Sequence, residues 1–161
     1  RSEAWAMIKE RQDLSFVIET KREHRFFKAL PGDWGDGYEN VTILCSVEIQ
    51  RRADDRIPAF LKLPVRHKGI LCEPLLEKLV LDAYLKTGEI AQVLCGGEQG
   101  ADARVCDFAW VLELMNQCVN CGVTFRFLRT GTFFRKGNRI YRIAEEEQEE
   151  QARRAGVDYT P

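Results

Sequence analysis

Acidic side chains follow three apolar runs of this sequence, at the point where each run ends. Glu48, Glu73 and Glu98 stand in the short segments Ser-Val-Glu, Glu-Pro and Gly-Gly-Glu. A fourth run is followed by the cations Lys21 and Arg22. If the runs are parallel strands, their carboxyl ends meet at one edge of a sheet, where neighbouring strands lie about 4.8 Å apart. Carboxylates this close must be paired, bind a metal ion or share protons, as in a binding or catalytic site.

A single carboxylate after a strand has an ordinary explanation, because it can cap the next helix or form a solvated ion pair. Three carboxylates in register favour a functional edge instead. Lys21, Arg22 and Arg129 are the available counter-charges. We therefore predict that the three carboxylates share one end of the sheet.

Two glycines, Gly96 and Gly97, come directly before Glu98. Glycines after a strand permit a tight turn and a close approach of the backbone to a ligand. The segment matches neither the dinucleotide-binding nor the Walker phosphate-binding pattern, because the further glycines or the lysine are absent. The pattern indicates a ligand without identifying it.

The six cysteines lie mostly inside apolar runs. Cys118 and Cys121 have the spacing of half a zinc site or of a redox pair, but both fall on the apolar stripe of a predicted helix. Cys45, Cys72 and Cys95 end neighbouring runs, where a thiol is usually a small buried hydrophobic group, with a ligand role as the alternative. We predict six reduced thiols and no metal ligands.

The chain has 161 residues, of which 45% are hydrophobic, and its 24 basic and 25 acidic side chains leave a net charge of −1. These values predict one globular domain over residues 1–161 and exclude disorder. No apolar run is long enough to cross a membrane, and the first residues do not have the pattern of a signal peptide. We therefore expect a cytoplasmic protein without a membrane partner.

Five short apolar runs alternate with longer helical patterns, which is typical of βα units around a parallel sheet. The runs are Leu14–Ile18, Val41–Val47, Gly69–Cys72, Gln92–Cys95 and Val123–Leu128. The predicted fold class is α/β, a partial (β/α) barrel of about five parallel strands over residues 1–131. A small β-hairpin and a polar helix complete the chain over residues 132–161.

The clearest helix begins after Asp107, a good N-cap, and ends at Gly122. A second helix starts near Ile49 and is predicted to break or kink at Pro58. A third is predicted after Pro74. Its inward residues would be Leu75, Leu79 and Tyr84.

The two ends of the chain carry weaker patterns. Ser2 is predicted to cap a first helix with Trp5 and Ile8 on its inner face. Residues 133–135 and 139–141 flank Lys-Gly-Asn and predict an antiparallel hairpin. A polar helix is predicted over residues 145–155.

Residues 123–143 contain six basic residues and no acid, interleaved with aromatic residues. The basic residues are Arg126, Arg129, Arg135, Lys136, Arg139 and Arg142, and the aromatic ones are Phe125, Phe127, Phe133, Phe134 and Tyr141. Guanidinium groups beside exposed rings can bind phosphates and stack bases. Alternatively, the rings lie in the core and the charges are solvated. The sequence leaves both interpretations open.

The strand-end segments together resemble an uncharacterised bacterial and phage-associated family. They are residues 20–22, 30–37, 46–48, 52–54, 72–76, 96–98, 102–104 and 130–131. Full-length members resemble radical S-adenosylmethionine enzymes, in which three closely spaced cysteines bind a [4Fe–4S] cluster. This chain has no such motif. The resemblance implies that it corresponds to the C-terminal two-thirds of the barrel, partnered by a missing N-terminal segment of the same protein.

The resemblance also implies roles. Catalytic roles fall to Lys21, Glu48 and Glu73, and cofactor binding falls to Gly96, Gly97, Glu98 and Arg22. S-adenosylmethionine and [4Fe–4S] are expected for the full-length protein, and neither for this chain alone, which would leave one side of the barrel exposed. The competing hypothesis is a non-enzymatic, phage-associated module that binds nucleic acid or a protein partner through residues 126–142.

Overall fold

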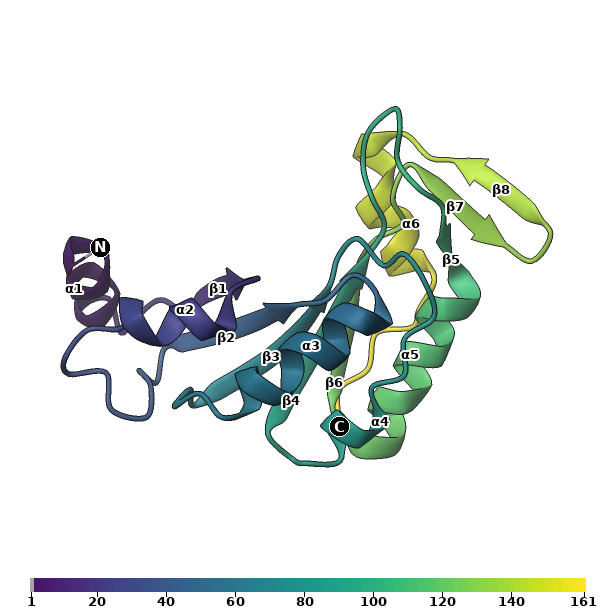
Figure 1. Ribbon diagram of the computed structural model, residues 1–161. Coiled ribbons are helices and arrows are strands. Elements are labelled where there is room, and N and C mark those ends of the chain that lie inside the picture. Colours follow the sequence, from purple (N-terminus) through teal and green to yellow (C-terminus); the bar gives the residue numbers. More distant parts are fainter. Residues whose placement is uncertain (1) are drawn as a thin grey trace.

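The computed structural model describes residues 2–161, without the side chains of residues 2, 24 and 27, and has an α/β architecture with two sheets (Figure 1). The larger sheet contains five parallel strands in the order β1-β2-β3-β4-β6. Its strands are β1 (Phe16–Thr20), β2 (Val41–Ser46), β3 (His67–Cys72), β4 (Ile90–Gly96) and β6 (Thr124–Arg129). The order follows the chain, as in a (β/α) barrel, and the sheet is open between β1 and β6. The predicted fold class is confirmed.

The second sheet has the order β5-β7-β8, with β5 at Cys106–Asp107, β7 at Phe133–Lys136 and β8 at Arg139–Arg142. The predicted hairpin corresponds to β7 and β8, which pair antiparallel. The third strand was not predicted, because two residues carry no periodicity. It forms where Cys106 pairs with Phe134 in parallel.

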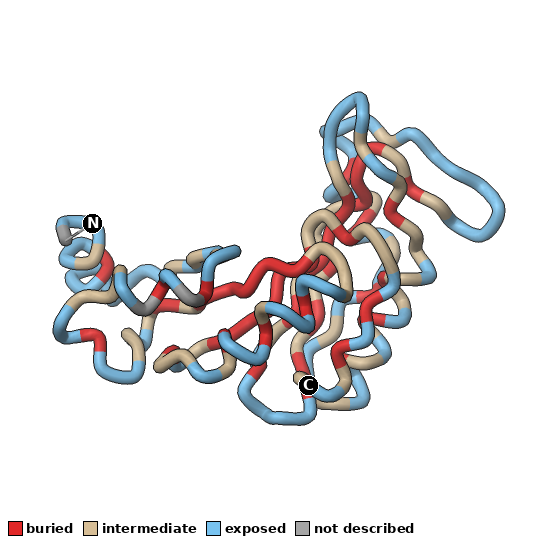
Figure 2. Tube along the Cα trace, in the orientation of Figure 1, coloured by how far each residue is buried: buried red, intermediate tan, exposed pale blue. Residues whose placement is uncertain are grey.

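The helices are α1 (Ser2–Glu10), α2 (Glu23–Phe26), α3 (Gln50–Leu61), α4 (Asp82–Leu85), α5 (Phe108–Cys121) and α6 (Gln148–Arg154), with 3₁₀ turns η1 (Phe27–Ala29) and η2 (Glu145–Glu147). α3 and α5 pack on one face of the large sheet (Figure 1). The hydrophobic core lies between these helices and the sheet, and Figure 2 shows buried residues along the strands of the sheet. The predicted Ser2 cap lies outside the described side chains. No helix in residues 2–161 combines the length and the apolar character needed to cross a membrane.

The first strand lies two residues later than predicted. Phe16 donates its N–H to the Asn40 carbonyl at 2.8 Å and is paired with Val41 in the register. The Leu14 carbonyl instead accepts from the side-chain amide of Asn40 at 3.2 Å. Leu14 therefore belongs to the connection between α1 and β1, which local hydrophobicity does not reveal.

Pro58 does not break α3, which was one of the two predicted effects of this proline. The helix continues to Leu61, and Ile57 before the proline and Phe60 two residues after it are fully buried. A proline removes one hydrogen bond and strains the preceding turn. Here the packing of both flanking turns against the sheet outweighs that cost.

The predicted helix after Pro74 is absent, and only the short α4 forms. The N–H groups of this segment bond to other elements: Leu75 donates to the Gly96 carbonyl and Leu76 to the Glu48 carbonyl. Leu75, Leu79 and Leu81 are buried nevertheless. The spacing of apolar residues reflects an extended segment packed across strand ends.

α5 begins and ends where the sequence predicts. The Asp107 side chain accepts a hydrogen bond from the Ala109 N–H at 2.9 Å, which satisfies one of the free donors of the first turn. Gly122 ends the helix in the left-handed region, with a φ of 64°.

The C-terminal segment packs along the edge strand β6 of the large sheet. The predicted single helix over residues 145–155 is η2 followed by α6, and α6 buries Gln148 and Ala152. Beyond it, Tyr159 forms an antiparallel bridge with Phe125 of β6, through hydrogen bonds of 2.9 and 3.0 Å.

Candidate functional site

The three predicted carboxylates lie at the carboxyl ends of adjacent strands. Glu48 stands two residues beyond β2, Glu73 one residue beyond β3, and Glu98 two residues beyond β4. These strands are neighbours and parallel, so their carboxyl ends form one edge. This confirms the predicted placement, and each carboxylate has a cation of its own.

Glu48 is held by two cations. Lys21 lies 2.8 Å from one carboxylate oxygen and Arg56 lies 3.2 Å from the other. Burial raises the pKa of Glu48, but the two cations outweigh burial and hold that pKa below its ordinary value. Lys21 was a predicted counter-charge. Arg56 was missed, because it reaches back from the second turn of α3, where it also donates to the Ser46 carbonyl.

Glu73 is partly buried and pairs with one cation. Arg129 Nε lies 2.8 Å from its carboxylate, as the predicted counter-charge, and Arg129 also donates to Gln99 at 2.8 Å. Burial raises the pKa of Glu73 above its ordinary value, in spite of Arg129, and the carboxylates of Glu19 and Glu149 add to the rise. Glu73 is therefore under-compensated by positive charge.

Glu98 is fully engaged within the chain. The guanidinium of Arg104 donates to both carboxylate oxygens, at 2.7 and 2.8 Å, and the backbone N–H of Arg104 donates at 2.8 Å. These hydrogen bonds lower the pKa of Glu98 to about 2. Arg104 was not foreseen, since nothing in the sequence shows that the loop folds back over six residues.

The pair of Glu98 and Arg104 predicts a pH dependence. The folded pKa of Glu98 is about 2, below its ordinary value of 4.5, so the pair stabilises the fold above pH 4.5, and this stabilisation is lost as the pH falls toward 2. In Arg104→Ala the pKa of Glu98 is expected to return toward 4.5. An NMR titration of the Glu98 carboxyl measures both values, with Arg51→Ala as a control on exposed α3. A pKa of Glu98 that is unchanged in Arg104→Ala contradicts this account.

Gly96 and Gly97 pack closely against other residues of the chain. A Cβ on Gly96 would lie 2.7 Å from Glu73 Oε1, and a Cβ on Gly97 would lie 2.2 Å from the Thr130 carbonyl oxygen. Gly97 also donates its N–H to the Arg129 carbonyl at 3.0 Å. The close backbone approach that the sequence predicted for a ligand is therefore made at Gly97 by the loop after β6.

Arg22 lies away from these ion pairs. It lines a separate cavity of about 360 Å³, together with Arg25 and Lys28. Its backbone N–H donates to the Thr20 hydroxyl at 3.1 Å. Thus the structure brings Lys21 to Glu48 and places Arg22 in other surroundings.

Two cavities share Gln99 and Arg129, and Glu73 lines one of them. One, of about 240 Å³, is lined by Glu73, Pro74, Gly97, Glu98, Gln99 and Arg129. The other, of about 470 Å³, is lined by Gln99, Arg129, Glu145, Glu146 and Glu149. We call this pair the acidic groove. Three of its carboxylates come from η2 and α6, for which the sequence pattern predicts only a polar helix.

The cysteines do not form a cluster site. All six are free, and five of them are buried: Cys45, Cys72, Cys95, Cys106 and Cys118. Over residues 2–161, no group of three or more His, Cys, Asp and Glu side chains is arranged to hold a metal ion. An iron–sulfur cluster needs three or four thiolates brought together, so the residues described do not fit one.

Burial predicts the reactivity of the thiols. Desolvation raises the pKa of Cys45, Cys106 and Cys118 to about 12, and that of Cys72 and Cys95 well above the ordinary value. A thiol reagent at neutral pH is therefore expected to modify one thiol of the native protein and six after denaturation. Cys121→Ser, at the half-buried position, is expected to abolish the native reaction. Rapid modification of several native thiols would contradict this burial.

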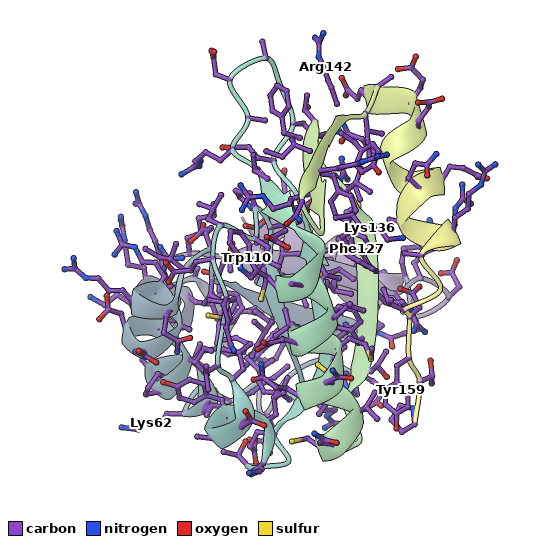
Figure 3. All side chains as sticks on the ribbon, turned by 90° about the vertical axis from the view of Figure 1, so that its right-hand side faces the viewer. Lys62, Trp110, Phe127, Lys136, Arg142 and Tyr159 are labelled. Carbon is purple, nitrogen blue, oxygen red and sulfur yellow. The ribbon has the colours of Figure 1, made fainter. Side chains whose placement is uncertain are left out.

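The predicted basic surface divides into two parts. Arg126 binds the Tyr159 carbonyl and the Thr160 hydroxyl, and Arg129 binds Glu73, so both are engaged in the large sheet. Figure 3 shows Tyr159 low on the molecule and Arg142 at its top. Phe125 and Phe127 are buried. Residues 126–142 therefore do not form one continuous surface.

Comparison with known proteins gives a family. No curated protein and no solved structure matches the chain. Residues 1–159 match the family described as "Protein of unknown function (DUF5131)". The match includes every element of the large sheet and the acidic groove. This chain, with its carboxylates at the ends of parallel strands, belongs to the DUF5131 family.

Proposed function

We propose that the chain is the C-terminal part of a radical S-adenosylmethionine-like protein and that its acidic groove binds the adenosylmethionine. The observation that carries the proposal is Glu73, a half-buried carboxylate whose pKa burial raises although Arg129 lies beside it. A ligand with a positive charge would supply the compensation that Glu73 lacks. Binding sites of α/β proteins also gather at the carboxyl ends of their strands.

The chemistry of the groove matches that ligand. S-adenosylmethionine carries a sulfonium and an ammonium group, which suit Glu73 and the carboxylates of Glu145, Glu146 and Glu149. Its own carboxylate suits Arg129, whose guanidinium can form paired hydrogen bonds. Glu98 has a structural role in this proposal, since Arg104 occupies both of its oxygens. When bound, adenosylmethionine supplies the reactive group, and these residues bind and orient it.

Isothermal titration calorimetry tests the proposal, with S-adenosylmethionine and S-adenosylhomocysteine as ligands. The first has a charged sulfonium and the second a neutral thioether, so tighter binding of the first is expected. Glu73→Gln is expected to remove this preference, whereas Glu10→Gln, which removes an exposed carboxylate of α1, keeps it. Absence of binding, or equal affinity of the native protein for both ligands, would refute the proposal.

A further inference from the structure

One face of the β7–β8 hairpin combines rings and cations. In the register, Phe134 pairs with Tyr141 and Lys136 pairs with Arg139. Paired residues lie on the same side of a sheet, and so do residues two apart along a strand. The two rings and two cations therefore share a face, with the rings next to the body of the protein and the cations at the tip of the hairpin.

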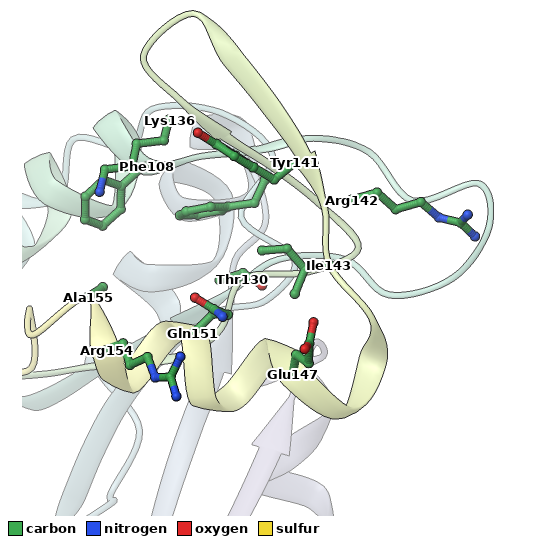
Figure 4. A pocket seen from close by; sticks show the side chains of 11 residues that line it. Phe108, Thr130, Lys136, Tyr141, Arg142, Ile143, Glu147, Gln151, Arg154 and Ala155 are labelled. Carbon is green, nitrogen blue, oxygen red and sulfur yellow. The ribbon is translucent and has the colours of Figure 1, made fainter.

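This face borders a cavity of about 400 Å³ between the hairpin, the start of α5 and α6 (Figure 4). The rings that line it are Phe108, Phe134 and Tyr141. Its volume falls in the range of small-molecule sites. Figure 4 shows the Arg142 side chain pointing away from it, whereas Lys136 at the hairpin tip and Arg154, which is paired with Glu150, line the cavity.

The C-terminal helical segment presents different residues on its different sides. Gln148 and Ala152 are buried, and Glu145, Glu146 and Glu149 line the acidic groove. The side facing the hairpin carries Glu147, Gln151 and Arg154. This segment therefore separates the cavity from the acidic groove. The acidic groove suits a cationic ligand, whereas the cavity suits an anionic one.

The cations at the tip are available. Lys136 lies 5.6 Å from the centre of the Phe108 ring, and neither Lys136 nor Arg139 forms an ion pair with a residue that the structure describes. By contrast, Arg135 on the other face of the hairpin is paired with Asp107 at 3.5 Å. Tyr141 is 44% exposed, and all four residues of β8 are exposed.

We propose that this cavity binds one nucleotide of a single-stranded nucleic acid. The base stacks on Tyr141, beside Phe134, and the neighbouring phosphates contact Lys136 and Arg139. Stacking platforms flanked by cations are a general means of holding single strands, because every base has a flat apolar face. The amide of Gln151 provides a donor and an acceptor for the base edge. An acidic peptide would use the cations but not the rings, which is why a nucleotide fits better.

Fluorescence anisotropy with a labelled oligothymidylate of about ten nucleotides tests the site, since single-strand sites span about 4–16 nucleotides. Tyr141→Ala is expected to weaken binding about fivefold or more, and Tyr141→Phe to retain it, because stacking requires the ring and not the hydroxyl. Ile140→Ala is the matched control, as it removes an exposed apolar side chain from the opposite face of β8. Thermal melts of all variants establish that they fold.

Salt dependence tests the cations separately. Each phosphate contact on a single strand contributes about −0.7 to the slope of log K against log salt, so Lys136→Ala/Arg139→Ala is expected to reduce the slope by about 1.4. Arg51→Ala/Arg52→Ala removes the same charge from exposed α3 and is expected to leave the slope unchanged. Unchanged affinity in Tyr141→Ala, tighter binding of duplex than of single strand, or equal displacement by polyglutamate would each overturn the proposal; the last result would indicate an acidic peptide. None of these results depends on adenosylmethionine binding.

Discussion

Replacing Gly97 with alanine is expected to lower the free energy of unfolding by about 3 kcal/mol, at the upper end for overpacked sites. The added Cβ would lie 2.2 Å from the Thr130 carbonyl oxygen and 2.8 Å from Gly131 Cα. Both are backbone atoms, so no side-chain rotation relieves the contact. Either β4 or the loop after β6 must move, and the hydrogen bond from the Gly97 N–H to the Arg129 carbonyl ties them together. Urea unfolding followed by circular dichroism measures the change.

Gly32→Ala is the matched control for this substitution. A Cβ on Gly32 would meet no atom within 4 Å, and its φ lies outside the left-handed region. Its effect is expected to stay within about 0.5 kcal/mol. Equal unfolding midpoints for Gly97→Ala and Gly32→Ala would show that the strand end and the loop are not locked together.

Phe125→Ala is expected to destabilise the fold by about 3–5 kcal/mol. The Phe125 ring is 0% exposed and belongs to the main core. Its backbone pairs with Val93 on one side and bridges to Tyr159 on the other. Removing the ring leaves a cavity at a position where the strands on both sides limit relaxation, so the loss approaches the upper part of the range. Urea unfolding of the variant provides the measurement.

The control for Phe125→Ala is Val17→Ala on β1. Val17 is an apolar strand residue too, but it is 59% exposed. Its truncation is expected to cost about 0.5 kcal/mol. Similar losses in the two variants would mean that burial in the described core does not determine stability.

Local signals were sufficient for the elements that satisfy their own hydrogen bonds. α5 has its cap at Asp107, its stop at Gly122 and an apolar stripe between them, and all three lie within one short stretch. The central strands β2 and β3 follow from the sequence because burial on both faces makes them almost continuously apolar. Such features need no knowledge of distant residues.

The segment before α4 shows why other parts could not be found. The Val80 N–H donates to the side chain of Gln50 and the Leu81 N–H to that of Gln117, at 2.7 and 2.6 Å. These partners are about thirty residues or more away, so periodicity within the segment carries no information about them. The apolar spacing predicts a helix because the hydrogen bonds that replace the helix are not local.

The residues of the candidate site also fall into two groups: those that the local sequence reveals and those that depend on distant contacts. The common edge of the three glutamates follows from parallel connections alone, and Lys21 and Arg129 were found because they lie at strand ends themselves. Arg56 and Arg104 come from a helix and a loop, whose orientation depends on packing. The prediction of one continuous basic surface was wrong because β6 and the hairpin direct their cations to different parts of the molecule.

The bridge at Tyr159 gives the large sheet two unequal edges. Along β6, the N–H of Phe125 bonds to the Tyr159 carbonyl and that of Phe127 to the Asp158 side chain. Among the residues that the structure describes, β2 is the single strand neighbour of β1, so the outer edge of β1 is open there. Growth of a fibre by strand addition requires two open edges on every subunit. The C-terminal segment therefore limits strand addition. Two copies can join through their β1 edges, and the joined large sheets then offer no open edge to a third copy.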